Sequence, residues 1–218
     1  LVTALLLLVL AGAAGGQQLF VALETDVPAH VADLAGYPNL DWTPLWNFAA
    51  SGAAASPDGA LYLCEGAFTT RLYRSDDLAP PTLLCTLSHD ITGLAFGRGE
   101  LYGYSNYATP KGIYRIDPAT GACTPVLDVY TGTGYLFFAL DYNPADDLFY
   151  GYTEYGDTGL YSIDIDTGEI LKVSDGPASW YGMARGLAVG ENIAFLTAVN
   201  GGEDSYFAYD LAQGPNGT

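Results

Sequence analysis

Short apolar and aromatic segments, each bounded by glycine, proline or aspartate, recur along this chain from about residue 51 to its end. Each repeat contains a segment of apolar and aromatic residues, followed by a second such segment that ends in aspartate. The second residue of each of these second segments is Leu72, Ile113, Leu160 or Tyr206, so the repeats follow one another at steps of 41, 47 and 46 residues. Short segments rich in aromatic and β-branched residues predict β-strands, and none of them has a helical period over three turns. Strands that repeat every 40–50 residues or so are typical of propeller blades.

Two of the repeats can be divided into four predicted strands each, separated by tight turns. The glycines of Gly97-Arg98-Gly99 suit a hairpin turn because glycine accepts a positive φ. Asp117 and Asp166 each begin a turn that ends in Thr-Gly, which is ordinary hairpin chemistry. The predicted strands are 93–96, 101–106, 113–116 and 123–129 in one repeat, and 138–142, 148–154, 160–165 and 170–174 in the next.

The residues of these repeats resemble the blades of a known group of proteins. Gly-Leu-Ala-Phe at 93–96, Leu-Tyr-Gly at 101–103 and Ile-Tyr-Arg-Ile-Asp-Pro-x-Thr-Gly at 113–121 are similar to secreted bacterial β-propeller repeats of the NHL-type, quinoprotein-like and surface-layer families. The resemblance covers about residues 51–218 and implies the fold rather than an activity. We therefore expect an all-β chain, a β-propeller with about four recognisable four-stranded blades at 51–90, 91–136, 137–184 and 185–218.

The first 16 residues carry a different signal. Leu1 to Leu10 is almost wholly apolar, and small residues follow it up to Gly16. This pattern is typical of the apolar region and cleavage site of a signal peptide, here without its basic start. We expect a mature chain from about Gln17, secreted to the extracellular space or periplasm. Residues 17–50 then form a partial first blade with an irregular insert, in a propeller that is a fragment of a longer one.

Charge narrows the classes of partner. Seven basic residues stand against 25 acidic ones, for a net charge of −18. Such a field repels nucleic acid and anionic membranes, so we expect neither a nucleic-acid partner nor membrane insertion of the mature chain. An extracellular protein or a glycan is the partner class that remains, and the sequence leaves the oligomeric state open.

Three candidate binding residues stand out from the repeat. Trp42 and Trp46 lie in the irregular insert, where nothing in the repeat requires a large aromatic side chain. Asp141 lies in Ala-Leu-Asp-Tyr, a predicted innermost strand, whereas the other innermost strands carry few polar groups. An acid at that position would face the central channel of a propeller, where ligands bind.

One segment resembles the start of a calcium loop. Asp164 and Asp166 alternate ahead of Gly168, but the bidentate glutamate of such a loop is replaced by Asp175. The two readings are a calcium site at Asp164 and Asp166, or a simple turn. No other cofactor is indicated.

The three cysteines are Cys64, Cys85 and Cys123. Cys64 and Cys85 fall in the second and fourth strands of one blade, so a strand separates them by roughly 10 Å, which is too far for a bond. Cys123 falls in the next blade. We interpret all three as buried thiols.

Two function classes follow. The first is a secreted binding or scaffold module that recognises a polysaccharide or a surface protein. The alternative is a propeller hydrolase or lyase that uses channel carboxylates, with calcium as an aid; Asp141 beside Asp90 and Glu191 would favour it. We assign no catalytic residue and favour binding.

Overall fold

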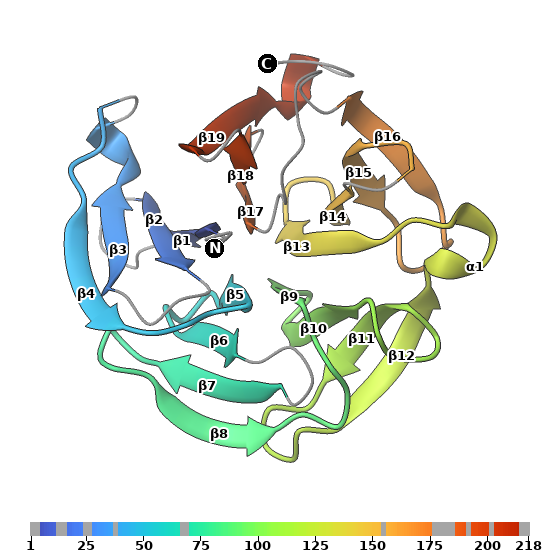
Figure 1. The fold of residues 1–218 in the computed structure, drawn as a ribbon, viewed down its shortest axis with the longest axis horizontal. Coiled ribbons are helices and arrows are strands. Elements are labelled where there is room, and N and C mark those ends of the chain that lie inside the picture. Colours follow the sequence, from blue (N-terminus) through green and yellow to red (C-terminus); the bar gives the residue numbers. More distant parts are fainter. Residues whose placement is uncertain are drawn as a thin grey trace.

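The computed structural model describes residues 5–11, 17–23, 28–36, 39–65, 70–153, 156–175, 186–190, 193–200 and 203–213. Within them, five antiparallel sheets are arranged around a common axis, as the blades of a β-propeller (Figure 1). In each blade the strands follow one another in chain order, so every connection is a hairpin between neighbours. The first strand of each blade lies nearest the axis.

The strand bounds of the first two blades are as follows. Blade 1 consists of β1 (Leu5–Ala11), β2 (Gln17–Leu23), β3 (Pro28–Asp33) and β4 (Thr43–Asn47), with the 3₁₀ turn η1 (Leu34–Gly36) between β3 and β4. Blade 2 consists of β5 (Gly52–Ala55), β6 (Leu61–Glu65), β7 (Arg71–Ser75) and β8 (Thr82–Thr86).

The remaining blades repeat this order. Blade 3 consists of β9 (Gly93–Gly97), β10 (Glu100–Ser105), β11 (Gly112–Ile116) and β12 (Cys123–Asp128). After the short helix α1 (Tyr130–Thr133), blade 4 consists of β13 (Phe137–Asn143), β14 (Leu148–Thr153), β15 (Gly159–Ile163) and β16 (Ile170–Asp175). Within the described residues, blade 5 has three strands, β17 (Gly186–Gly190), β18 (Ile193–Asn200) and β19 (Glu203–Asp210), followed by η2 (Leu211–Gln213).

Contacts between innermost strands join the five blades into a ring. β1 contacts β5, β5 contacts β9, β9 contacts β13, β13 contacts β17, and β17 contacts β1. Small residues in these strands allow the close approach. A Cβ at Gly93 would lie 3.1 Å from the backbone nitrogen of Leu140 in β13.

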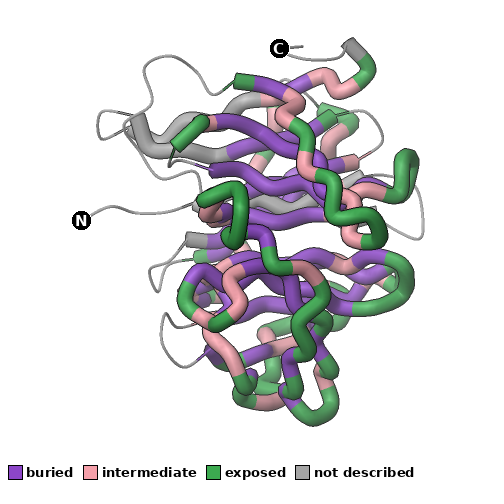
Figure 2. The backbone as a smooth tube through the Cα atoms, turned by 90° about the vertical axis from the view of Figure 1, so that its right-hand side faces the viewer, coloured by how far each residue is buried: buried purple, intermediate pink, exposed green. Residues whose placement is uncertain are grey.

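The hydrophobic core is divided into clusters that lie between neighbouring blades. One cluster joins Cys64 and Leu72 of blade 2 to Leu94 and Tyr114 of blade 3. Another joins Leu19 and Val21 of blade 1 to Ala188 and Phe195 of blade 5, which closes the ring by apolar packing. Figure 2 shows the buried stretches along the strands and the exposed ones at the turns. Because each blade buries both faces against its neighbours, the ring rather than the single blade is the stable unit.

The structure confirms an all-β propeller but corrects the number of blades, which is five and not about four in the part of the chain that the structure describes. The missing strands lie in the first 50 residues. β3 begins at Pro28 and contains few of the aromatic and β-branched residues that mark the other strands, and Leu5–Ala11 forms β1. An apolar strand and the apolar part of a leader look alike in sequence. The signal peptide and the fragmentary state of the propeller stay predictions.

The predicted strands of the two best-defined repeats agree closely with the structure. The segments predicted at 93–96, 113–116 and 138–142 fall within β9, β11 and β13. The alternation of side chains and the turn residues therefore carried enough information to place individual strands.

Candidate functional site

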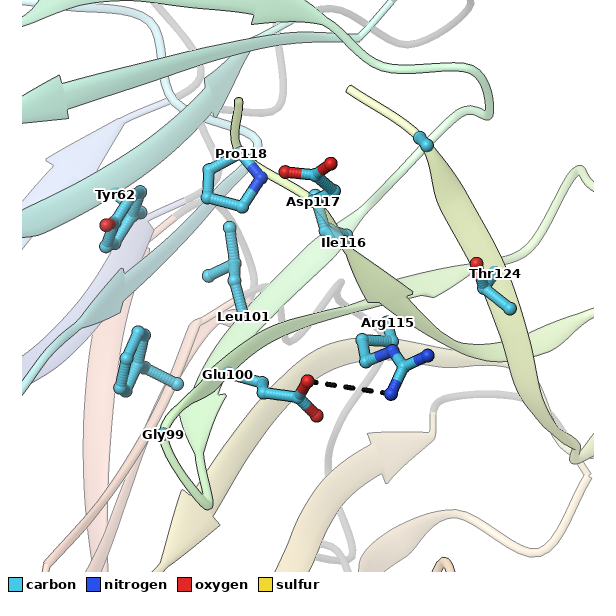
Figure 3. Close-up of a pocket in the computed structure, with 11 residues that line it drawn as sticks. Tyr62, Gly99, Glu100, Leu101, Arg115, Ile116, Asp117, Pro118 and Thr124 are labelled. Atoms are coloured by element: carbon cyan, nitrogen blue, oxygen red, sulfur yellow. Dashed lines mark ion pairs between the residues drawn. The ribbon is translucent and has the colours of Figure 1, made fainter. Parts of the chain in front are cut away.

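A pocket with a volume of about 520 Å³ lies where the strands of blade 3 end, next to blade 2 (Figure 3). This volume is within the range of small-molecule binding sites. Tyr62 of β6 contributes from blade 2, and the four strands of blade 3 with their β9–β10 and β11–β12 turns contribute the rest. The lining residues are Tyr62, Phe96, Gly99, Glu100, Leu101, Arg115, Ile116, Asp117, Pro118, Ala122 and Thr124.

One side of the pocket is aromatic. The rings of Tyr62 and Phe96 stack with their centroids 6.1 Å apart and their planes 11° from parallel. The guanidinium of Arg74 lies 5.5 Å from the centroid of the Tyr62 ring, and its Nη1 donates a hydrogen bond of 3.0 Å to the Tyr62 hydroxyl. Because Arg74 is also ion-paired with Asp76 at 2.8 Å, the Tyr62 ring is held in place before any ligand arrives.

The other side of the pocket carries a half-exposed ion pair. Nη1 of Arg115 lies 3.5 Å from Oε1 of Glu100, on adjacent strands (Figure 3). Oε2 of Glu100 accepts a hydrogen bond of 3.2 Å from the Tyr102 hydroxyl. Burial, followed by the charge of Glu100, raises the pKa of Tyr102. The pair therefore offers one carboxylate and several N–H donors to a polar ligand.

Asp117 lies at the pocket but serves the β11–β12 turn. Its Oδ1 accepts a hydrogen bond of 2.9 Å from the Ala119 N–H, and its Oδ2 accepts one of 2.6 Å from the Thr120 hydroxyl. The Thr120 hydrogen bond is the main cause of the lowered pKa of Asp117. This carboxylate thus holds the turn at the rim of the pocket, with one hydrogen bond to each of its oxygens.

Asp141 lies in β13 and binds across to the next blade. Its Oδ2 accepts a hydrogen bond of 2.7 Å from the Val189 N–H of β17, and its Oδ1 accepts one of 2.8 Å from the Tyr142 N–H. The side chain is buried, and this burial raises the pKa of Asp141 to about 7. The strand register shows that an acid is unusual at this position. Asp141 pairs with Tyr150 of β14, and the first strands of blades 2, 3 and 5 carry alanine at the equivalent position, namely Ala54, Ala95 and Ala188.

Asp164 and Asp166, the predicted calcium ligands, are engaged with protein groups. Oδ1 of Asp164 accepts a hydrogen bond of 2.8 Å from the Asp166 N–H, as in a hairpin turn. Oδ2 of Asp166 lies 2.9 Å from Nη1 of Arg98, which comes from the β9–β10 turn of blade 3. No group of three or more potential metal-ligating side chains occurs in the part of the chain that the structure describes. Calcium binding stays a prediction.

Arg98 also binds Asp147 in the β13–β14 turn. Its Nε lies 2.7 Å from Oδ1 and its Nη2 3.0 Å from Oδ2 of that carboxylate, in a bidentate arrangement. The Tyr142 hydroxyl donates a further hydrogen bond of 2.6 Å to Oδ1 of Asp147. These contacts connect blades 3 and 4. They hold the pKa of Asp147 below its usual value, with the Arg98 hydrogen bond as the largest cause.

The two tryptophans predicted to bind a ligand, Trp42 and Trp46, lie on opposite faces of blade 1. Trp46 of β4 packs into the cluster between blades 1 and 2, and its Nε1 donates a hydrogen bond of 2.8 Å to the Leu78 carbonyl. Trp42 packs against the cluster between blades 1 and 5. Their binding role stays a prediction. The structure thus places Trp42, Trp46, Asp141 and Asp166 at four different blade boundaries.

The pocket residues were not singled out by the sequence. Tyr62, Glu100 and Arg115 stand at ordinary positions of the repeat, where an aromatic or charged residue indicates packing or solvation. The signal that could have drawn attention to Tyr62 is its position in the repeat. Tyr62 and Tyr102 pair with equivalent residues of β5 and β9, so they lie at the same depth in neighbouring blades.

Comparisons with known proteins agree with the fold. No protein-family model and no curated protein matches the chain, whereas 277 chains of solved structures do. TolB from Acinetobacter baumannii is 14% identical with a TM-score of 0.55, over 97% of this chain and 51% of that one. A gluconolactonase from Xanthomonas campestris is 17% identical with a TM-score of 0.51, over 83% of this chain and 65% of that one. A puromycin hydrolase is 21% identical with a TM-score of 0.47, over 92% of this chain and 35% of that one.

These likenesses concern the fold, and the chain spans between about a third and two thirds of the length of these three structures. No helix in the described residues is long and apolar enough to cross a membrane. The register, the ring of inner strands and the structural neighbours together identify the chain as a β-propeller repeat protein that no single family accounts for.

Proposed function

We propose that this chain is a secreted β-propeller binding module, and that the pocket beside Tyr62, Glu100 and Arg115 accepts a unit of an extracellular polysaccharide. The observation that carries the proposal is the chemistry of the pocket, which places an aromatic pair on one side and an ion pair on the other. Sugar rings present apolar C–H faces and a rim of hydroxyls, so they use both kinds of side chain. A surface protein is the other partner class.

Binding is favoured over catalysis because the charged groups at the pocket are already paired. Glu100 is paired with Arg115, and Asp117 is engaged in its own turn. An enzyme site needs a group that is ready to transfer a proton or attack a substrate. In a binding site, by contrast, charge-assisted hydrogen bonds to ligand hydroxyls are sufficient.

The test measures binding of soluble polysaccharides by titration calorimetry, with a neutral glucan, a uronic-acid polymer and an amino-sugar polymer as probes. We expect at least one to bind and Arg115→Ala to weaken that binding by about tenfold, the effect of losing a hydrogen bond to a charged group. The matched control is Arg71→Ala. Arg71 lies 3.2 Å from Glu65 and is as exposed as Arg115, but it is not a lining residue of the pocket.

Two results would overturn the proposal. The first is that no polysaccharide binds the wild-type protein. The second is equal weakening by Arg115→Ala and Arg71→Ala, because that would place binding on general charge rather than on the pocket.

A hydrolase or lyase is the second candidate, and Asp141 favours it. A carboxyl with a pKa of about 7 is suited to general acid–base catalysis at neutral pH. Against this, both of its oxygens are bonded to backbone N–H groups, and Glu191, a predicted partner, lies outside the described residues. Turnover of a sugar lactone, chosen because one structural neighbour is a gluconolactonase, that is lost in Asp141→Asn would favour this function.

A further inference from the structure

Two of the three cysteines, Cys85 and Cys123, lie at the boundary between blades 2 and 3. Cys85 of β8 pairs in register with Leu72 of β7, and Cys123 of β12 pairs with Ile116 of β11. Paired residues of adjacent strands point to the same face of a sheet. Leu72, Ile116 and Cys123 all belong to the cluster between these blades, and Cys85 packs against it.

Both sulfur atoms lie against the same turn, between β11 and β12. Sγ of Cys85 lies 3.5 Å from the Pro118 carbonyl oxygen, and Sγ of Cys123 lies 3.7 Å from that of Gly121. Gly121 has no side chain to keep them apart. A Cβ there would lie 3.3 Å from the Cys85 sulfur and 2.2 Å from the Thr86 carbonyl oxygen.

Hydrogen bonds join the two backbones at this point. The Ser88 N–H donates to the Gly121 carbonyl at 2.9 Å, and the Cys123 N–H donates to the Ser88 hydroxyl oxygen at 3.0 Å. The segment that follows β8 therefore runs beside the segment that leads into β12. The thiols are attached to segments that these hydrogen bonds already hold together, so pairing them requires little movement of the backbone.

We propose that Cys85 and Cys123 form a disulfide that links the outer strands of blades 2 and 3 when the chain meets a small-molecule disulfide. The Cys85 thiolate attacks that disulfide, forms a mixed disulfide and releases one thiol. The Cys123 thiolate then attacks the Cys85 sulfur and releases the second thiol. Two protons leave the protein thiols, and two electrons reduce the small disulfide. Cys85 reacts first because it is the more exposed of the two.

Cys64 is the internal control. It is fully buried, and burial raises its pKa to about 12, which suppresses its thiolate. It shares a register row with Cys85, but Leu72 lies between them on β7. Cys64 therefore stays a thiol while the other two pair.

The test treats the whole chain with oxidised glutathione at pH 8 and counts thiols under denaturing conditions. We expect the count to fall from three to one, the mass to fall by about 2 Da, and a peptide containing Cys85 to be linked to one containing Cys123. The melting temperature should rise by several degrees, because the bond restricts the unfolded chain. In Cys64→Ser, a replacement outside the pair, the count should fall to zero.

Three results would overturn the proposal. The first is a chain that keeps three thiols. The second is a chain that holds a stable glutathione adduct on Cys85 without closing the bond. The third is a linked peptide that contains Cys64. Because the readout is covalent, failure here leaves the polysaccharide proposal untouched.

Discussion

Blade 4 is joined to both of its neighbours by acidic side chains, whereas an aromatic pair lies between blades 2 and 3 and a pocket remains at one end of that boundary. On one side of blade 4, Arg98 reaches from blade 3 to Asp147 and Asp166. On the other side, Asp141 accepts the Val189 N–H of blade 5. Between blades 2 and 3, Tyr62 stacks on Phe96 and the pocket opens beyond the pair.

The difference teaches where a repeat protein has room for a site. The strands and their register are equivalent in blades 2, 3 and 4. At the boundary between blades 3 and 4, the Tyr142 ring lies over Gly97 and its hydroxyl reaches Asp147, so the space is filled. At the boundary between blades 2 and 3, the corresponding position holds Phe96, which has no hydroxyl. Small changes at equivalent positions thus decide whether a blade boundary is filled by side chains or leaves a pocket.

The largest effect is expected at Asp141 as the pH changes. Its folded pKa of about 7 is above its ordinary value of 3.8, so the folded state keeps a proton that the unfolded chain has lost. The contribution of Asp141 to the free energy of unfolding is therefore complete below about pH 4. It is lost as the pH rises through 7, and the loss is as much as about 4 kcal/mol. Asp141→Asn should remove that slope, measured by urea unfolding at pH 5 and pH 8.

The control for Asp141 is Asp164→Asn. The pKa of Asp164 is lowered, chiefly by the Thr167 hydrogen bond. Its contribution to the stability of the folded state is therefore lost only as the pH falls toward acid values. That variant should keep the slope between pH 5 and 8. If Asp141→Asn keeps the slope as well, the blade 4–blade 5 contact does not titrate in this range.

The next effect is expected at Gly97, where the boundary between blades 3 and 4 is tightest. A Cβ at this position would lie 2.6 Å from Cγ of the Tyr142 ring, and a ring has no flexible end to move aside. Gly97→Ala should lower the free energy of unfolding by about 2 kcal/mol through overpacking. Gly99→Ala is the comparison, because nothing lies within 4 Å of a Cβ there.

Gly99 has a φ of +80°, so its alanine variant should still cost about 1 kcal/mol from backbone strain. Chemical denaturation of both variants separates crowding from strain. Equal losses would mean that the boundary between blades 3 and 4 is no tighter than the open turn.

The smallest effect is expected at Arg98. Arg98→Gln removes the charge that connects blades 3 and 4, but the carboxylates it binds are mostly exposed. Ion pairs of exposed carboxylates typically contribute up to about 1 kcal/mol, so the melting temperature should fall by about 2 °C at low salt. The loss should shrink in 1 M salt, because screening weakens the wild-type contact. A loss that does not depend on salt would indicate that packing of the arginine stem, rather than its charge, joins the blades.

Strand placement was predictable because each blade strand is marked locally. β10 and β11 are aromatic alternating segments, and the Asp-x-x-Thr-Gly turns at Asp117 and Asp164 form the side-chain hydrogen bonds expected of them. The first blade was less predictable. β3 begins with proline, and Leu5–Ala11 has a composition that strands share with leaders.

The candidate site was not predictable, because its parts are far apart in the sequence. Tyr62 and Glu100 come from different blades. The ion pair between Asp166 and Arg98 was not visible in the sequence either, because the two residues lie 68 positions apart. The sequence marks Asp141 as unusual for an inner strand. It could not show that Asp141 accepts a hydrogen bond from the Val189 N–H, because Val189 belongs to the adjacent blade.

The sequence by itself determined the all-β repeat, the turns and the acidic surface, because these depend on residues within a few positions of one another. Only the tertiary structure decided the number of blades, which boundaries are sealed, where the pocket lies and which cysteines share a blade boundary. The physical reason is that a blade has two faces, and the fit of each face depends on side chains from another repeat about 40–50 residues away.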